Sequence, residues 1–168
     1  MRILLLSLLF ALTASAQPSG DTVYYVFTEI DRLEDGRLTT TDEAEWRIMQ
    51  QENRPEETFE QGAAVIIVLG AQREGRGGMA YIGGERLPVS LVGGSPERER
   101  GRRHSLLLAD AEHRRLTLVN GDVRRVMDPD ISLDFPGDRL VELILTADRQ
   151  HLLDTSRGLK IRVSPVVR

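Results

Sequence analysis

Apolar and polar residues alternate along much of this chain, and this two-residue period predicts β-strands with one buried and one solvent-facing side. Near the C-terminus, for example, Leu159, Ile161 and Val163 are separated by Lys160 and Arg162. The same period predicts strands in segments 104–109, 115–119, 123–127, 131–135 and 141–145.

Two segments are apolar without alternation. Thr22–Ile30 is rich in β-branched and aromatic residues, and Ala63–Leu69 is a continuous apolar run bounded by glycines. Strands of this composition are typical of the middle of a fold, where both faces are covered. We therefore expect both segments to be central strands.

Turn residues divide the rest of the chain. Glycine pairs bracket two short strands, 79–82 and 85–92, and Pro88 predicts that the second lies at a sheet edge, because proline donates no ladder hydrogen bond. Asn120-Gly121 predicts a hairpin with a two-residue type I′ turn.

One helix is predicted, after Thr40. Thr40 and Glu43 have the spacing of a capping box, and Pro55 would end the helix near Asn53. The apolar residues of this segment form no single stripe, which favours a helix lying across one end of the sheets. A weaker helical turn is predicted for Asp148–Thr155.

Together these elements predict an all-β fold. About ten short strands with one capping helix are typical of an antiparallel β-sandwich or a partly open barrel. The alternative is an α+β fold in which the helix packs on a sheet face.

The first residues predict export. Arg2 precedes the apolar segment Ile3–Leu12, and Ala14-Ser15-Ala16 fits a signal-peptidase site, so we expect residues 1–16 to be a cleaved signal peptide. Residues 17–168 would then form a single β-rich domain that is periplasmic or secreted. No later segment approaches the ~20 apolar residues of a membrane span, so none is expected after cleavage. The chain has no cysteine, so its stability must come from its core.

The charge argues against a nucleic-acid partner. The formal net charge is −4, and removal of the leader takes one of 22 basic residues and none of 26 acidic ones, which leaves −5.

An acidic segment supplies a candidate metal site. Asp31, Asp35, Thr39 and Asp42 have a spacing that resembles an EF-hand or dockerin calcium loop, with Gly36 at the sharp turn. The segment departs from that pattern because Leu33 stands where an oxygen ligand belongs and position twelve is Asp42 rather than glutamate. The alternative is a hairpin with a type I′ turn at Asp35-Gly36, which pairs Glu34 with Arg37 and Leu33 with Leu38. Calcium is the only cofactor that the sequence suggests.

Other polar clusters have ordinary interpretations. A second acidic group would serve as turn residues unless it collects calcium, and it comprises Asp128, Asp130, Asp134 and Asp138. His113 and His151 have acidic neighbours but lack zinc-site spacing, which favours surface histidines.

A charged segment supplies the candidate binding residues. Ser95–Ser105 is predicted to be a loop that either grips an anionic surface polymer or is simply solvated, with glutamates partly neutralising Arg98, Arg100, Arg102 and Arg103. Trp46 could stack on a sugar or a peptide, although core packing is the alternative.

No catalytic motif is present, because the chain lacks cysteine, a G-x-S-x-G elbow and a phosphate-binding loop. We therefore expect an exported, non-catalytic module that binds or scaffolds an envelope protein or a surface polymer. One alternative is a hydrolase that uses carboxylates such as Glu85, Glu112 or Glu142. The other is a calcium-stabilised adhesion module.

Overall fold

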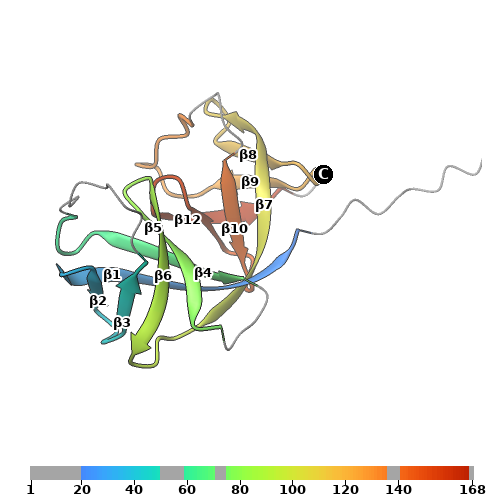
Figure 1. The fold of residues 1–168 in the computed structure, drawn as a ribbon. Coiled ribbons are helices and arrows are strands. Elements are labelled where there is room, and N and C mark those ends of the chain that lie inside the picture. The colour runs from blue at the N-terminus through green and yellow to red at the C-terminus, as the bar shows by residue number, and fades with distance from the viewer. Residues whose placement is uncertain (1–19, 50–58, 71–74, 136–140, 167–168) are drawn as a thin grey trace, which may run out of the picture.

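The computed structural model describes residues 20–49, 59–70, 75–135 and 141–166. Within these ranges the protein is all-β, with twelve antiparallel strands and no helix (Figure 1). The strands of the N-terminal half are β1 Thr22–Glu34, β2 Arg37–Thr40, β3 Glu45–Ile48, β4 Ala64–Gly70, β5 Gly77–Ile82 and β6 Glu85–Gly93. Those of the C-terminal half are β7 Glu99–Asp110, β8 Arg115–Leu118, β9 Val123–Val126, β10 Glu142–Thr146, β11 His151–Asp154 and β12 Leu159–Pro165.

The first six strands close into a barrel, which we call the first ring. The strand order is β1-β2-β3-β6-β5-β4, and pairing of β1 with β4 closes it. Its core holds the inward residues of every strand, such as Leu38, Trp46 and Ile67. The expected all-β antiparallel fold is confirmed, and of the two expected architectures, a β-sandwich or a partly open barrel, it is the barrel that forms, here closed.

The last six strands repeat this order and form the second ring. β7-β8-β9-β12-β11-β10 is closed by pairing of β10 with β7. Its core includes Leu116, Leu143 and Ile161. The connection from β9 to β10 packs Leu133 against this core, flanked by Ile131 and Phe135.

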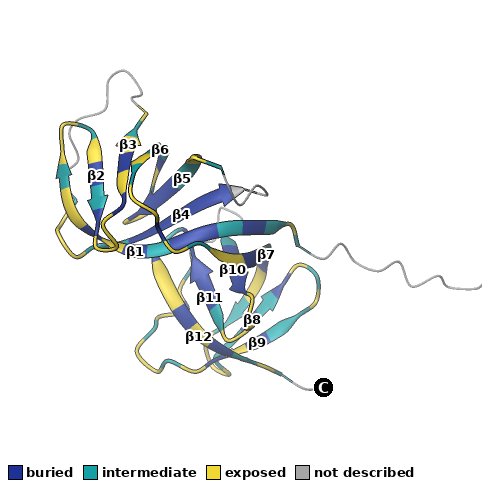
Figure 2. Cartoon of the chain, turned by 90° about the horizontal axis from the view of Figure 1, so that it is seen from below, coloured by how far each residue is buried: buried dark blue, intermediate teal, exposed yellow. Residues whose placement is uncertain are grey.

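A seam of paired strands and apolar side chains joins the two rings. The N-terminal part of β1 pairs with β7, from Thr22 opposite Arg102 to Tyr25 opposite Glu99. A third apolar cluster lies between the outer faces of the rings; it contains Val23, Tyr25, Ile66, Val68, Tyr81, Ile144 and Leu153. The first part of β1, residues 22–28, and β4 are therefore covered on both faces (Figure 2), as their unbroken apolar sequences predicted.

The predicted helix after Thr40 is wrong over residues 41–49, and its continuation to Asn53 lies outside the described residues. The Thr40 and Glu43 backbones close a turn instead: Glu43 N–H donates to Thr40 O, and Glu43 has a positive φ of 62°. β3 then follows with Ala44 and Trp46 buried between exposed residues. The alternation of Ala44 and Trp46 has the period of a strand, which the capping-box spacing obscured. The helical turn predicted at 148–155 is also wrong, because it contains β11.

Pro88 does not mark an edge, since β6 lies between β3 and β5. The Pro88 carbonyl accepts a hydrogen bond from Met49 N–H, just past the end of β3. Proline is tolerated at this position because an N–H here would point beyond the last paired residue of β3.

Two further local predictions need correction. The Asn120-Gly121 hairpin forms, but only Gly121 has positive φ, and Gly121 N–H donates to Leu118 O across a wider turn than type I′. Segment 131–135 alternates in burial as expected, yet it pairs with no described strand.

None of the described residues forms a helix that could cross a membrane. The predicted signal peptide lies outside the described residues.

Candidate functional site

The acidic segment at the end of β1 forms the β1–β2 hairpin that was the alternative to a calcium loop. Asp35 and Gly36 have φ of 50° and 69°, as a type I′ turn requires, and the predicted pairings of Glu34 with Arg37 and Leu33 with Leu38 are both present.

The side chains of this hairpin do not converge as ligands. Asp31 lies at the irregularity between Ile30 and Arg32, and Asp42 accepts a hydrogen bond of 2.5 Å from the Thr40 hydroxyl. A depression of about 490 Å³ is lined by Asp35 and Thr39 together with Glu34 and Glu45. Arg32 and Arg37 also line it, and these two cations offset most of the negative charge that a metal would need there.

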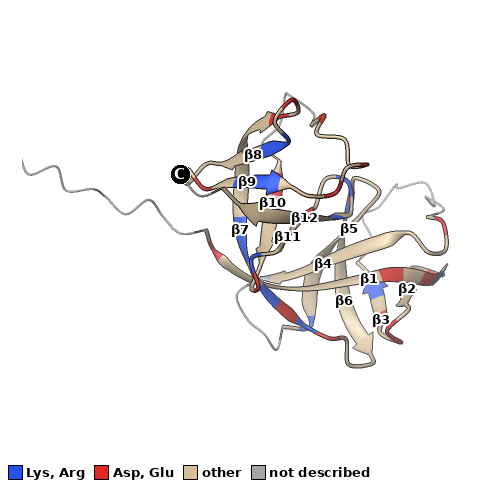
Figure 3. Ribbon diagram, turned by 180° about the vertical axis from the view of Figure 1, so that it is seen from behind, with Lys and Arg blue, Asp and Glu red and all other residues tan. Residues whose placement is uncertain are grey.

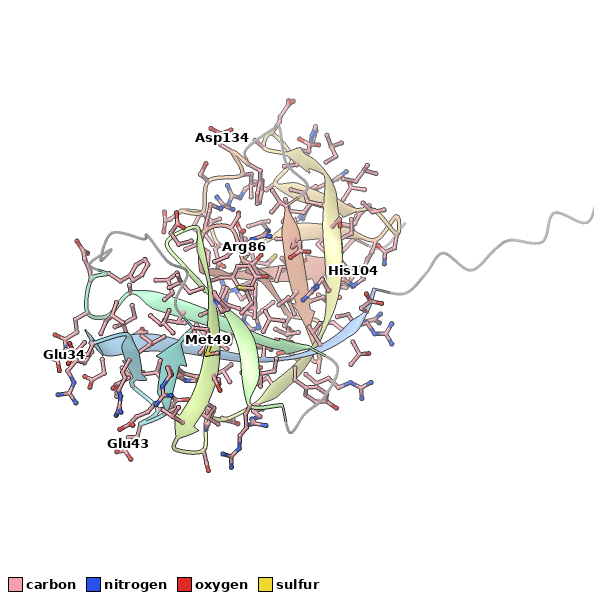
Figure 4. The ribbon with its side chains drawn as sticks, viewed as in Figure 1. Glu34, Glu43, Met49, Arg86, His104 and Asp134 are labelled. Atoms are coloured by element: carbon pink, nitrogen blue, oxygen red, sulfur yellow. The ribbon has the colours of Figure 1, made fainter. Side chains whose placement is uncertain are left out.

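The second acidic group is dispersed as well. Asp128 accepts from Arg162 N–H at 2.6 Å, Asp134 is exposed, and Asp138 lies outside the described residues. Figure 4 shows Asp134 far from Glu34 of the first hairpin. In the described ranges, no three histidine or acidic residues come together as a metal site would require.

Trp46 is a core residue of the first ring. Its side chain has 0% exposure, and its indole N–H has no hydrogen-bond partner in the described part of the chain. Tyr25 is equally buried and donates a 2.6 Å hydrogen bond to Glu99. Neither aromatic side chain has exposed surface for stacking on a ligand.

The charged segment Ser95–Ser105 is not a loop throughout, because β7 begins at Glu99. Successive side chains of a strand point to opposite faces, so β7 sorts its arginines. Arg100 and Arg102 share a face with His104, whereas Arg103 lies opposite Ile144 on the face toward the seam. Arg98 precedes the strand.

The face that carries Arg102 and His104 is the inner face of the second ring. His104 pairs with Leu143, and both Leu143 and Leu106 belong to the core. Arg102, opposite Leu145, stands at the point where β7 enters the ring. Figure 4 shows His104 on β7. One end of this ring is therefore polar, while the β9–β10 connection supplies apolar residues at the other end.

Figure 3 shows basic residues on β7 and on β9. Two further arginines come to the same end from distant parts of the chain. Arg124 at the start of β9 is 3% exposed and donates to the Asp122 carboxylate at 2.6 and 3.1 Å. It also donates to the carbonyl of Arg149, in the exposed turn between β10 and β11, at 3.3 Å. We call this group the basic end; it consists of Arg102, His104, Asp122, Arg124 and Arg149.

His104 is the least satisfied member of the basic end. It is 8% exposed, and its Nε2 has no hydrogen-bond partner among the described residues. Burial lowers the pKa of His104, Asp122 opposes this shift, and the charges of Arg102, Arg124 and Arg149 add to it. The imidazole is therefore neutral at neutral pH.

The charge at this end is only partly compensated. Asp122 is engaged by the buried Arg124, whereas Arg100, Arg102 and Arg149 form no ion pair with any described residue. Guanidinium groups in such a setting can hold carboxylate, phosphate or sulfate groups through paired hydrogen bonds. The arrangement suits binding of an anion rather than of a cation.

The carboxylates considered for hydrolysis lie on separate elements. Glu85 begins β6, Glu112 is exposed in the turn after β7, and Glu142 begins β10. Glu142 lies near Tyr81 at the seam, where burial and this carboxylate raise the pKa of the tyrosine.

Sequence reasoning found Arg100 and Arg102 but missed His104, Arg124 and Arg149. Arg124 did carry a signal, because a two-residue period from Val126 places it on the inner face of β9. Arg149 carried none, since only the folded chain brings its turn to β9.

Comparisons with known proteins found no match for this chain among protein-family models, curated proteins or solved structures. The site must therefore be interpreted from its own chemistry.

Proposed function

We propose that this protein is an exported, non-catalytic module that binds an acidic polymer of the cell envelope at the basic end of its second ring. The observation that carries the proposal is the presence of Arg102 and Arg149, without ion-pair partners in the described chain, at the rim of a ring whose interior also holds Arg124. Arg100 extends this basic surface along β7.

The arginines of the basic end would have two roles. The exposed guanidinium groups of Arg102 and Arg149 would donate paired hydrogen bonds to its acidic groups, while the buried Arg124 holds the turn of Arg149 in place through its carbonyl. The net charge of the whole chain is negative, so attraction to a polyanion must come from this local arrangement rather than from the overall charge.

Calorimetric titration with a soluble polyuronate tests the proposal. We expect binding that weakens as salt is raised from about 50 to about 200 mM, because arginine contacts displace counterions. Reversing two charges, in the double variant Arg102→Glu/Arg149→Glu, should weaken binding by at least about tenfold, equivalent to about 1.4 kcal/mol.

A matched control uses the first ring. Arg32 and Arg37 are also exposed, so Arg32→Glu/Arg37→Glu makes the same change in net charge away from the basic end. The control should bind like the wild type. Equal loss in both double variants would mean that binding follows total charge, and the proposal would be wrong.

Export is tested separately. The leader predicts that protein recovered from the periplasm or medium begins at Gln17. Recovery of the uncleaved chain from the cytosol would contradict this part of the proposal.

A further inference from the structure

We propose that binding of an anion at the basic end is coupled to the uptake of one proton by His104. This inference rests on the proposed function, and it adds that the affinity of the site depends on pH.

The position of His104 supports the coupling. Its imidazole lies on the inner face of the second ring, and its Nε2 is buried without a hydrogen-bond partner in the described ranges. An unpaired buried nitrogen is unfavourable, because it has lost hydrogen bonds to water without replacing them. Gly20, just before β1, also lies against this imidazole and brings no charge: a Cβ there would be 3.0 Å from His104 Cε1. The imidazole thus keeps hydrogen-bonding capacity that the described residues do not use.

The charged groups around His104 come from three elements. Arg102 lies two residues earlier on the same face of β7, and Arg149 lies in the turn that follows β10. Arg124 and Asp122 come from β9 and the turn before it, and they already pair with each other. The surroundings of the imidazole thus have a net positive charge.

An anion bound at the basic end would reduce the positive charge around His104. In the free protein the neutral form of His104 is favoured mainly by burial; protonation would also add a cation beside three arginines, an effect that Asp122 opposes. An anion bound by Arg102 and Arg149 offsets their charge and attracts the imidazolium. A proton from solution would then occupy the ring, so that both ring nitrogens become N–H donors; no other bond is made or broken.

Thermodynamic linkage fixes the direction of the effect. A complex that holds more protons than the free protein becomes tighter as pH falls. With one group involved, the affinity can rise by at most about tenfold per pH unit. The rise should end once the pH is low enough for free His104 to be protonated as well.

Proton uptake can be measured directly. Titration of the wild-type protein with the polyuronate near pH 6, in buffers of different ionisation enthalpy, should show uptake of up to one proton per site. His104→Gln should show no uptake and an affinity independent of pH in this range. His151 belongs to the neighbouring β10–β11 hairpin and lies 3.6 Å from Asp148, so His151→Gln is the matched control and should retain the uptake.

A second measurement does not depend on a His104 variant that folds. The chain has three histidines, so His113→Gln and His151→Gln suffice to assign the three imidazole signals in proton NMR spectra. The midpoint of the His104 titration should move to higher pH when polyuronate is added, while that of His113 stays unchanged.

The outcomes separate the two proposals. Binding without proton uptake, uptake lost in His151→Gln, or a His104 midpoint unmoved by polyuronate would each overturn the coupling and leave the proposed function intact. Absence of polyuronate binding at low salt would overturn the proposed function, and the coupling with it.

Discussion

Gly101 lies in β7 where this strand pairs with β1 of the first ring and with β10 of the second ring. Its replacement provides a sharp test of the fold. On β7 it pairs with Val23 of β1 and with Thr146 of β10. A Cβ atom at this position would lie 2.6 Å from Ile144 Cγ2 and 2.9 Å from the carbonyl oxygen of Leu145. Both distances are shorter than van der Waals contact, so Gly101→Ala must displace β10.

The size of the effect follows from which atoms can move. The Ile144 side chain can adjust its position, but the Leu145 carbonyl is part of the backbone of β10 and is not free to rotate away. Overpacking of a well-packed interior costs about 1–3 kcal/mol, and the backbone contact places Gly101→Ala in the upper half of that range, about 2–3 kcal/mol. For a chain of this size the melting temperature should fall by about 4–12 °C.

The assay is urea unfolding of the purified protein, with Gly77→Ala as the matched control. Gly77 also lies in a strand and has no positive φ, but a Cβ there would meet nothing closer than Val89 O at 3.9 Å. The control should stay within about 0.5 kcal/mol of the wild type.

A double variant identifies the contact responsible. Gly101→Ala should cost less in the Ile144→Ala background, since removal of Cγ2 relieves the shortest of the close contacts, while those with Leu145 O and with Tyr25 Cε1 at 3.1 Å stay. If Gly101→Ala is as stable as Gly77→Ala, the close approach of β1, β7 and β10 is not as described, and the account of the seam is refuted.

Three other results are expected from the same protein. Leu133→Ala should lose roughly 2–5 kcal/mol of unfolding free energy in urea, because Leu133 is buried in the core of the second ring, while the exposed Asp134→Ala should change it by less than about 0.5 kcal/mol; equal effects would mean that segment 131–135 does not cover the core. The lowered pKa of His104 means that the unfolded chain binds more protons than the folded protein below about pH 6.5. The free energy of unfolding should therefore decrease as the pH is lowered in this range, by up to about 1.4 kcal/mol per pH unit. His104→Gln should flatten this slope in denaturant titrations. Millimolar calcium should leave the melting temperature within about 1 °C of that in a chelator, since the Asp35-Gly36 hairpin needs no ion, and a larger rise would revive the calcium interpretation.

The strands were predictable where side chains alternate or where both faces are apolar. β12 shows the first pattern and β4 the second, and both segments are strands in the structure. The Asp35-Gly36 hairpin was predictable down to its register, because the turn type and the two flanking pairs agree. In each case the deciding interactions lie within a few residues along the chain.

The two rings and the extent of β7 were not predictable from local pattern. Closure depends on pairing of β1 with β4 and of β10 with β7, which joins segments far apart in sequence. Residues 104–109 of β7 were predicted as a strand, but the first residues of β7 resembled a loop because they are mostly charged. Their pairing with β1 and β10 joins segments that are distant in sequence. The helix prediction failed for a similar reason: burial of Trp46 in the ring outweighed the local capping signal.

Two buried polar groups in the second ring show why the basic end, rather than another polar cluster, is the place to seek function. Asp154 is fully buried, yet its carboxylate accepts hydrogen bonds from Ser156 N–H, the Ser156 hydroxyl and Arg157 Nε, all within its own turn. Such a group is accounted for by the fold alone, because its partners are supplied locally. His104 is nearly as buried, but its Nε2 has no partner in the described chain, and burial, together with the surrounding arginines, disfavours its protonation. An unpartnered buried nitrogen is not by itself a sign of function, because the indole N–H of Trp46 in the core of the first ring also lacks a partner among the described residues. His104 differs from Trp46 in the three arginines near it, so an anion held by those arginines would interact with the imidazole as well.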